Sequence, residues 1–193
     1  MYNTNNTKTM NSGKITLKLL ALIAVFGFWS CSDDDDPAPI DEEETITTLT
    51  AVLAETGGST ITLQSRDLDG DGPDAPVITV SGPLAANTSY AGAITLLNET
   101  ESPAENITEE IEEEDDEHQF FFATTGNINS VTYADQDDDG NPVGLSFVLT
   151  TGDAGAATIT ITLRHEPKKP NDGTLSDAGG ETDIAQSFTL DIQ

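Results

Sequence analysis

The chain has 193 residues, of which 35 are acidic and only seven are lysine or arginine, so its net charge is −28. A surface this anionic repels the phosphates of nucleic acids, which require basic patches, and it repels anionic lipid headgroups for the same reason. A single cysteine excludes an intramolecular disulfide, and the length indicates one domain. We therefore expect cations or cationic ligands as partners, and no nucleic acid.

The first 30 residues have the pattern of a secretory signal peptide. They contain three lysines and no acidic residue, followed by an apolar run from Leu19 to Trp29. That run is shorter than the roughly 20 residues that a membrane-spanning helix needs, and it fits the 7–15-residue core of an export signal. Residues 1–30 are therefore predicted to direct export, with either Met1 or Met10 as the start.

The sequence around Cys31 resembles a bacterial lipobox, in which the cysteine becomes the first mature residue and carries acyl chains. The pattern usually has leucine where Phe28 stands, a departure similar to the relaxed lipoboxes of Bacteroidota. The residues directly after the cysteine resemble the signal that sends such lipoproteins to the outer face of the outer membrane; they are Ser32, Asp33, Asp34, Asp35 and Asp36. Two or three acyl chains, each stabilised by about 0.8 kcal/mol per buried CH₂, would anchor the protein firmly. The alternative is that Cys31 is an unmodified structural thiol.

Residues 31–44 are predicted to form a lipidated acidic tether, because they are charged, contain proline and have one large apolar residue, Ile40. From residue 45 to residue 193 the sequence changes to the alternation of apolar and polar residues that is typical of half-buried strands. The clearest example is "AATITITLRH", in which Ala157, Ile159, Ile161 and Leu163 share one face. This second part is predicted to be the folded domain.

Eight further strands are predicted from weaker forms of the same pattern. Four lie in "STITLQS", "YAGAITLL", "GLSFVLTT" and "QSFTLDI", and four are expected at Thr45 to Leu53, Val77 to Val80, His118 to Thr124 and Val131 to Ala134. Short strands separated by Gly, Asn and Asp, without alternating helices, favour an all-β fold. We predict an immunoglobulin-like antiparallel β-sandwich.

One segment, "SPAENITEEIEEEDDEH", is predicted to be a short acidic helix. Ser102 and Glu105 have the spacing of a capping box, with Pro103 at the first helical position. Ile107 and Ile111 would form a narrow apolar stripe against the sandwich. The acidic residues at the end of the segment lie at the negative end of the helix dipole, so the helix is expected to fray there.

Two loops share the pattern D-x-D-x-D-G, in which alternate carboxylates could converge on Ca²⁺. The candidate ligands are Asp67, Asp69 and Asp71 in the first loop and Asp135, Asp137 and Asp139 in the second. An EF-hand is excluded because its bidentate glutamate is replaced by Ile78 and Ser146. The alternative is that both segments are ordinary turns on an acidic surface.

A transition-metal site is a second hypothesis. His118 follows Glu114 by four residues at the end of the predicted helix, and His165 lies at the end of a predicted strand. Two imidazoles with a carboxylate suit Zn²⁺ or Cu²⁺, provided that the helix end meets the strand end. A histidine that only packs or forms hydrogen bonds is the alternative.

Catalytic motifs for nucleophilic hydrolysis, zinc proteolysis and nucleotide binding are absent from the sequence. The segments "LQSRDLDGDGP", "LNETESPAENITEEIEEEDDEHQFFF" and "TLRHEPKKP…GGETDI" resemble small surface lipoproteins of Bacteroidota. Such chains often carry the label of type 1 periplasmic-binding-fold proteins and are encoded beside TonB-dependent receptors. The two α/β lobes that this label implies do not suit so short and strand-rich a chain.

The resemblance implies a lipid-anchored protein of the outer membrane, exposed at the cell surface, with a TonB-dependent receptor as partner. The expected function is non-catalytic capture of a cation or cationic ligand. The alternative is a structural or adhesive module whose acidic loops are made rigid by calcium.

Overall fold

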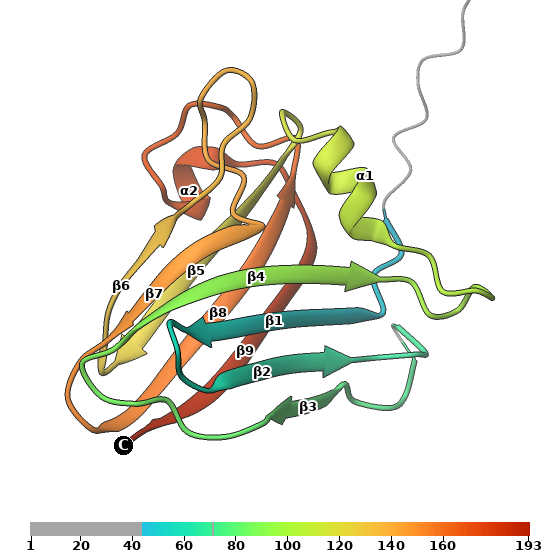
Figure 1. Cartoon of the computed structure of the whole chain (residues 1–193). Coiled ribbons are helices and arrows are strands. Elements are labelled where there is room, and N and C mark those ends of the chain that lie inside the picture. The colour runs from blue at the N-terminus through green and yellow to red at the C-terminus, as the bar shows by residue number, and fades with distance from the viewer. Residues whose placement is uncertain (1–43, 71) are drawn as a thin grey trace, which may run out of the picture. The chain divides into compact units, whose positions relative to one another are not determined.

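The computed structural model describes residues 44–70 and 72–193 (Figure 1). The predicted signal peptide, the predicted lipidation site Cys31, the acidic run from Ser32 to Asp36 and the candidate ligand Asp71 lie outside the described residues. Within the described part, no helix is long and apolar enough to cross a membrane.

All nine predicted strands are present in the described residues. They are β1 (Thr48–Glu55), β2 (Thr60–Arg66), β3 (Val77–Val80), β4 (Ser89–Leu97), β5 (His118–Gly126), β6 (Ile128–Tyr133), β7 (Ser146–Thr151), β8 (Gly155–His165) and β9 (Glu181–Ile192). Two helices accompany them, α1 (Ile107–Glu113) and α2 (Leu175–Ala178).

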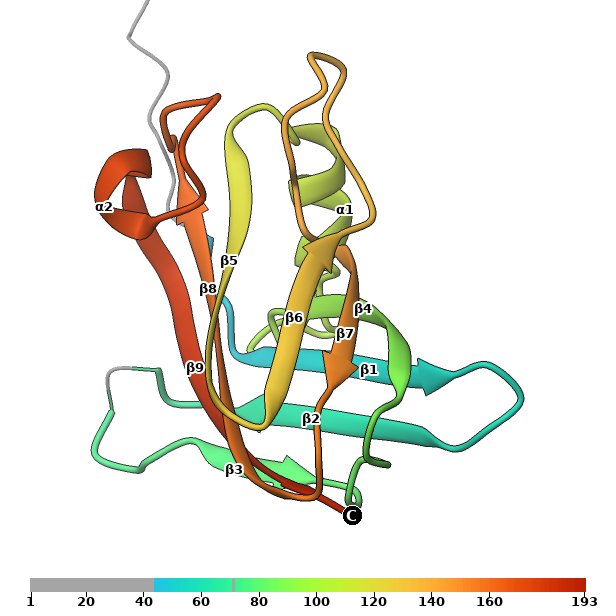
Figure 2. The ribbon, with the colours of Figure 1, turned by 90° about the vertical axis from the view of Figure 1, so that its left-hand side faces the viewer.

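The strands form two antiparallel sheets. One has the order β3-β2-β1-β4-β7-β6 and the other β5-β8-β9. The prediction of an all-β antiparallel sandwich is confirmed, and its six-plus-three division differs from the four-plus-three arrangement of immunoglobulin constant domains. Figure 2 shows that the large sheet twists strongly, since β6 and β7 run steeply across the direction of β1 and β2.

The core lies between the two sheets and follows the predicted alternation. Ile159, Ile161 and Leu163 of β8 are fully buried, together with Phe120 of β5 and Phe147 of β7. Burying a side chain of this size stabilises the fold by about 1.5–3 kcal/mol. The described residues include no cysteine, so no disulfide joins them, and apolar packing holds the sandwich together.

Helix α1 begins four residues later than the capping box predicts. Glu105 exchanges both backbone hydrogen bonds with Asn98, which holds it in an extended bridge instead of a helical turn. The helix starts after Asn106, and the predicted capping role of Ser102 and Glu105 is therefore wrong.

The predicted helical start at Pro103 is wrong as well, but the predicted apolar stripe and the early end of the helix are confirmed. Ile107 and Ile111 are buried against the sandwich. The helix ends at Glu113, so that Asp115, Asp116 and Glu117 follow it in a turn. The last helical turn contains no basic residue, and like charges at the negative end of the dipole are the physical reason.

Candidate functional site

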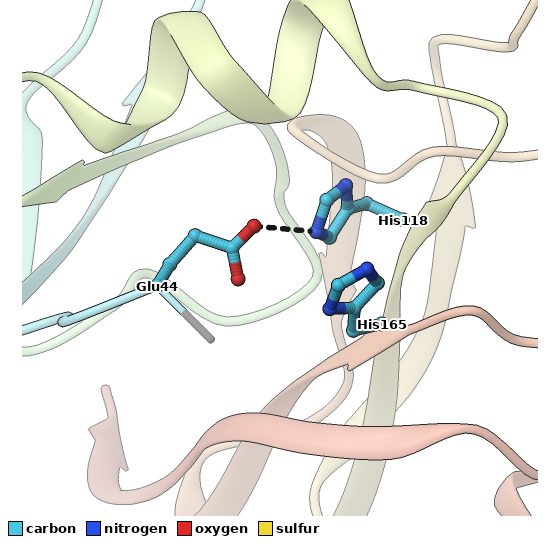
Figure 3. Close-up of side chains that lie close together, drawn as sticks. All are labelled: Glu44, His118 and His165. Carbon is cyan, nitrogen blue, oxygen red and sulfur yellow. Dashed lines mark ion pairs between the residues drawn. The ribbon is translucent and has the colours of Figure 1, made fainter. Parts of the chain in front are cut away.

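His118 and His165 lie directly opposite each other at one end of the sandwich. His118 opens β5, His165 closes β8, and the two residues pair in the antiparallel register. Their rings stack with centroids 4.7 Å apart and planes inclined by 24° (Figure 3). The end of α1 thus meets the end of β8, which is the condition that the transition-metal hypothesis requires.

His118 is oriented by the chain that leads out of α1. Its ring is fully buried, and its Nδ1 lies 3.0 Å from the backbone oxygen of Glu114. A carbonyl can only accept, so Nδ1 carries the hydrogen and Nε2 of a neutral ring carries the lone pair. The predicted role of the Glu114 carboxylate is corrected, since Glu114 contacts the ring through its backbone and its side chain is not part of the cluster.

The carboxylate of the cluster comes from Glu44, the last residue of the predicted tether. Its side chain is 6% exposed, and its Oε1 lies 3.1 Å from Nε2 of His118 (Figure 3). Neither Nε2 of His118 nor Oε2 of Glu44 has a hydrogen-bond partner among the described residues.

The start of β1 explains why Glu44 reaches this position. Thr47 donates its backbone N–H and its hydroxyl to the carbonyl of Leu97 at the end of β4. These two bonds fix the backbone at Thr47, three residues after Glu44, beside the segment that leads from β4 into α1. Nothing in the local sequence distinguishes Glu44 from Glu42 and Glu43, so only the register of β1 against β4 identifies it.

Burial and charge act in opposite directions on this pair. Burial by itself lowers the pKa of His118, but the contact with Glu44, the carbonyl of Glu114 and the negative charge of Asp183 outweigh it, so the pKa is raised above its usual value. Burial likewise acts to raise the pKa of Glu44, but contact with His118 prevails and the pKa is lowered. The site therefore favours a positive charge between Nε2 and the carboxylate.

A second group of ligand-bearing side chains adjoins the first and shares His165. It consists of Glu117, His165 and Glu166, which can bring one ligand atom each to within 4.8 Å of the others. The Glu117 side chain is 53% exposed, and its Oε2 lies 3.9 Å from Nε2 of His165. This group faces solvent, whereas Glu44 and His118 do not.

The second predicted calcium loop uses its carboxylates internally. Asp135 accepts backbone hydrogen bonds from Gly144 at 2.7 Å and Ser146 at 2.6 Å. Asp137 is buried, accepts from the backbone N–H of Asn141 and pairs with Lys169 at 3.2 Å, while Asp139 is exposed. The three carboxylates do not form one of the ligand clusters found among the described residues. Calcium binding by this loop stays a prediction.

The first predicted calcium loop also contains internal turns. The Asp67 carboxylate accepts a hydrogen bond from the backbone N–H of Asp69, and the Asp69 carboxylate accepts one from the backbone N–H of Asp74, both at 3.3 Å. Asp67 and Asp69 line an open pocket of about 350 Å³ beside Val77 of β3. None of the described residues that line this pocket belongs to the histidine clusters. With Asp71 outside the described residues, calcium binding here stays a prediction as well.

The four basic side chains of the described residues all have acceptors. Arg66 pairs with Glu99 at 2.6 Å, Lys168 with Asp177 at 3.0 Å, and Lys169 with Asp137 at 3.2 Å. Arg164 donates to the backbone oxygen of Gly180. These four cations are therefore engaged within the fold.

The chain was also compared with known proteins. No protein-family model matches it, and neither the curated proteins nor the solved structures yielded a match. A function for the protein must therefore be inferred from its own residues.

Proposed function

We propose that the protein is a non-catalytic binding module that captures a divalent transition-metal ion, Zn²⁺ or Cu²⁺, through Glu44, His118 and His165. One observation carries the proposal: Nε2 of His118 and Oε1 of Glu44 lie 3.1 Å apart and are buried, and neither Nε2 nor the second carboxylate oxygen, Oε2, has a hydrogen-bond partner among the described residues. The Glu114 carbonyl gives Nε2 of neutral His118 a lone pair, so both atoms are acceptors. Two buried acceptors at this distance are stable only with a positive charge between them, either a proton or a metal ion.

The donor set suits these metals. Zinc binds imidazole nitrogen and carboxylate oxygen with bonds of about 2.0–2.1 Å, which places tetrahedral ligands about 3.3 Å apart. The distance of 3.1 Å from Oε1 of Glu44 to Nε2 of His118 is close to this value, and the ligand atoms of the whole set lie within 4.8 Å of one another. A shift of about 1.5 Å would therefore bring His165 into the coordination sphere, with water in the fourth position.

The hydrogen bond from His118 to Glu114 is further support. Ligand histidines usually donate their second ring nitrogen to a carbonyl or carboxylate, which sets the tautomer and the ring orientation. His118 has this arrangement before any ion is bound.

The cellular setting of the proposal comes from the sequence. A lipid on Cys31 would hold the domain at the outer face of the outer membrane, and a TonB-dependent receptor is the proposed recipient of the captured ion. The acidic surface would raise the local concentration of cations at the site. A binding role also agrees with the absence of catalytic motifs from the sequence.

A structural or adhesive module is the second candidate. The observation that favours it is the β6–β7 loop, which is already held by Asp135, Asp137 and Lys169. Such a module would show a rigid surface and no transition-metal affinity. The calcium version of this candidate requires ligands other than the inward-facing Asp135 and Asp137.

Isothermal titration of the purified protein with Zn²⁺ and Cu²⁺ tests the proposal. We expect one ion per chain, with affinity reduced at least tenfold by Glu44→Gln, His118→Ala or His165→Ala. Glu114→Gln is the matched control, since it removes the same charge from a neighbouring residue but no ligand, and its affinity should stay within twofold of the unmodified protein. Equal losses in Glu44→Gln and Glu114→Gln, or no binding by the unmodified protein, would contradict the site.

A further inference from the structure

His165 belongs to two clusters that differ greatly in exposure. The inner cluster contains Glu44 and His118, whose side chains are 6% and 0% exposed. The outer cluster contains Glu117, whose side chain is 53% exposed, and the exposed Glu166. His165 itself is 11% exposed. The exposed fraction of the side chains therefore falls from Glu117 and Glu166, through the shared His165, to the buried pair of Glu44 and His118.

The backbone brings the outer ligands together at an energetic cost. Glu166 has a φ of 48°, in the left-handed region that non-glycine residues rarely adopt because it is strained. Its N–H donates to the backbone oxygen of Glu117 at 2.7 Å, which fixes the two residues side by side. Gly180 packs so closely that a Cβ there would lie 2.3 Å from the backbone oxygen of His165. The chain holds this corner in a strained, tightly packed conformation.

The chemistry of imidazole limits how the two clusters can be used. A neutral ring has one lone pair and one N–H, so His165 can bind an ion in only one cluster at a time. Both clusters can be filled together only if the ring also loses its second proton. The two positions are therefore alternatives for one ion.

We propose that Glu117, His165 and Glu166 form an entry position, where an ion from solvent first binds before it moves to the buried cluster of Glu44, His118 and His165. This inference rests on the proposed function. The exposed carboxylates replace part of the hydration shell of the ion, and His165 stays a ligand while Glu44 and His118 replace Glu117 and Glu166. Where the two positions use different ring nitrogens, one proton leaves the ring to water and another returns from water, so no net charge is left behind.

An entry position has a kinetic signature. It lowers the barrier between solvent and the buried site, and a change in the free energy of the barrier alone changes the association and dissociation rate constants by the same factor. Removing the entry ligands should therefore slow association and dissociation by the same factor and leave the dissociation constant unchanged. A ligand of the final complex would behave differently, because its loss accelerates dissociation.

Stopped-flow measurements on the full chain test this, with Zn²⁺ as the ligand and a fluorescent chelator as competitor. In the double variant Glu117→Gln/Glu166→Gln we expect both rate constants to fall by about tenfold, within the range by which local ligand concentration changes association rates. The matched control is Glu112→Gln/Glu113→Gln, which removes the same two charges from exposed residues of α1. Its rate constants should change by less than about twofold at physiological ionic strength, where screening acts beyond about 8 Å.

The possible outcomes separate the two proposals. If the double variant behaves as the control does, or if its dissociation constant rises with faster release, the entry role is wrong and the buried site stands. If two ions bind per unmodified chain, the mutual exclusion at His165 is wrong. If the unmodified chain binds no Zn²⁺, both the entry position and the proposed function are overturned.

Discussion

Lys169 and Asp137 form a buried ion pair, with Nζ 3.2 Å from Oδ2 and side chains only 6% and 1% exposed. The pair joins the loop after β8 to the loop between β6 and β7. Lys169 also donates to the backbone oxygen of Asp115, which follows α1. One lysine thus holds together three segments at the end of the sandwich that carries the histidines, where both views place α1, α2 and the β6–β7 loop (Figures 1 and 2).

Removing this lysine should destabilise the protein strongly. Lys169→Met leaves the Asp137 carboxylate buried without its cation, and breaking a buried pair in this way costs about 3–5 kcal/mol. Lys168→Met is the matched control, because Lys168 pairs with Asp177 at the surface and such pairs contribute at most about 1 kcal/mol. Urea unfolding of both variants measures the difference, and equal midpoints would contradict the assigned role of Lys169.

The pair of Glu44 and His118 should make stability depend on pH. Folding raises the pKa of His118 above 6.5, so the stabilisation from its protonation is complete below pH 6.5 and is lost as the pH rises through the folded-state pKa. Folding lowers the pKa of Glu44 below 4.5, so its contribution is complete above pH 4.5 and is lost as the pH falls through the folded-state pKa. In the presence of a chelator, the contribution of the pair is therefore largest between about pH 4.5 and 6.5.

Glu44→Gln should remove most of this dependence. The free energy of unfolding, measured in urea between pH 5.5 and 8.5, is expected to fall less steeply with pH in this variant than in the unmodified protein. Glu114→Gln removes an equal charge and serves as the control for general acidic repulsion. Parallel curves for the two variants would show that Glu44 does not hold the proton of His118.

Gly92 should be difficult to replace, because the ring of Phe147 occupies the space of a side chain. A Cβ at position 92 would lie 2.4 Å from two ring atoms of Phe147. Gly92→Ala is therefore expected to cost about 1–3 kcal/mol through overpacking. The double variant Gly92→Ala/Phe147→Leu should recover part of the loss caused by the alanine, as a double-mutant cycle of thermal unfolding would show. Strict additivity of the two changes would argue against this contact.

Lipidation of Cys31 can be tested by mass spectrometry of the protein from its membrane fraction. We expect the mature chain to begin at Cys31 with acyl chains attached, and Cys31→Ser to abolish both the modification and the membrane association. Replacing Asp33 to Asp36 by alanine should leave the lipid in place and reduce cleavage by protease added to intact cells. A mature N-terminus elsewhere in the chain would refute the assigned anchor.

Local features of the sequence predicted most of the fold. In β8, the alternation of Ile159 and Ile161 with threonine is a property of the strand itself, because successive side chains point to opposite faces. The same reasoning located all nine strands and the buried stripe of Ile107 and Ile111. It predicted the wrong start for α1, because the backbone of Glu105 pairs with the backbone of Asn98 instead of entering the helix as the capping box requires.

The candidate site could be predicted only in part. The sequence by itself determined that two histidines end up near strand or helix ends in an acidic chain, because residue type and periodicity are local properties. Only the tertiary structure decided that His118 and His165 stack, that Glu44 and not Glu114 supplies the carboxylate, and that Asp135 and Asp137 turn inward. These choices depend on the register between strands distant in the chain, and that register is set by packing of the whole core.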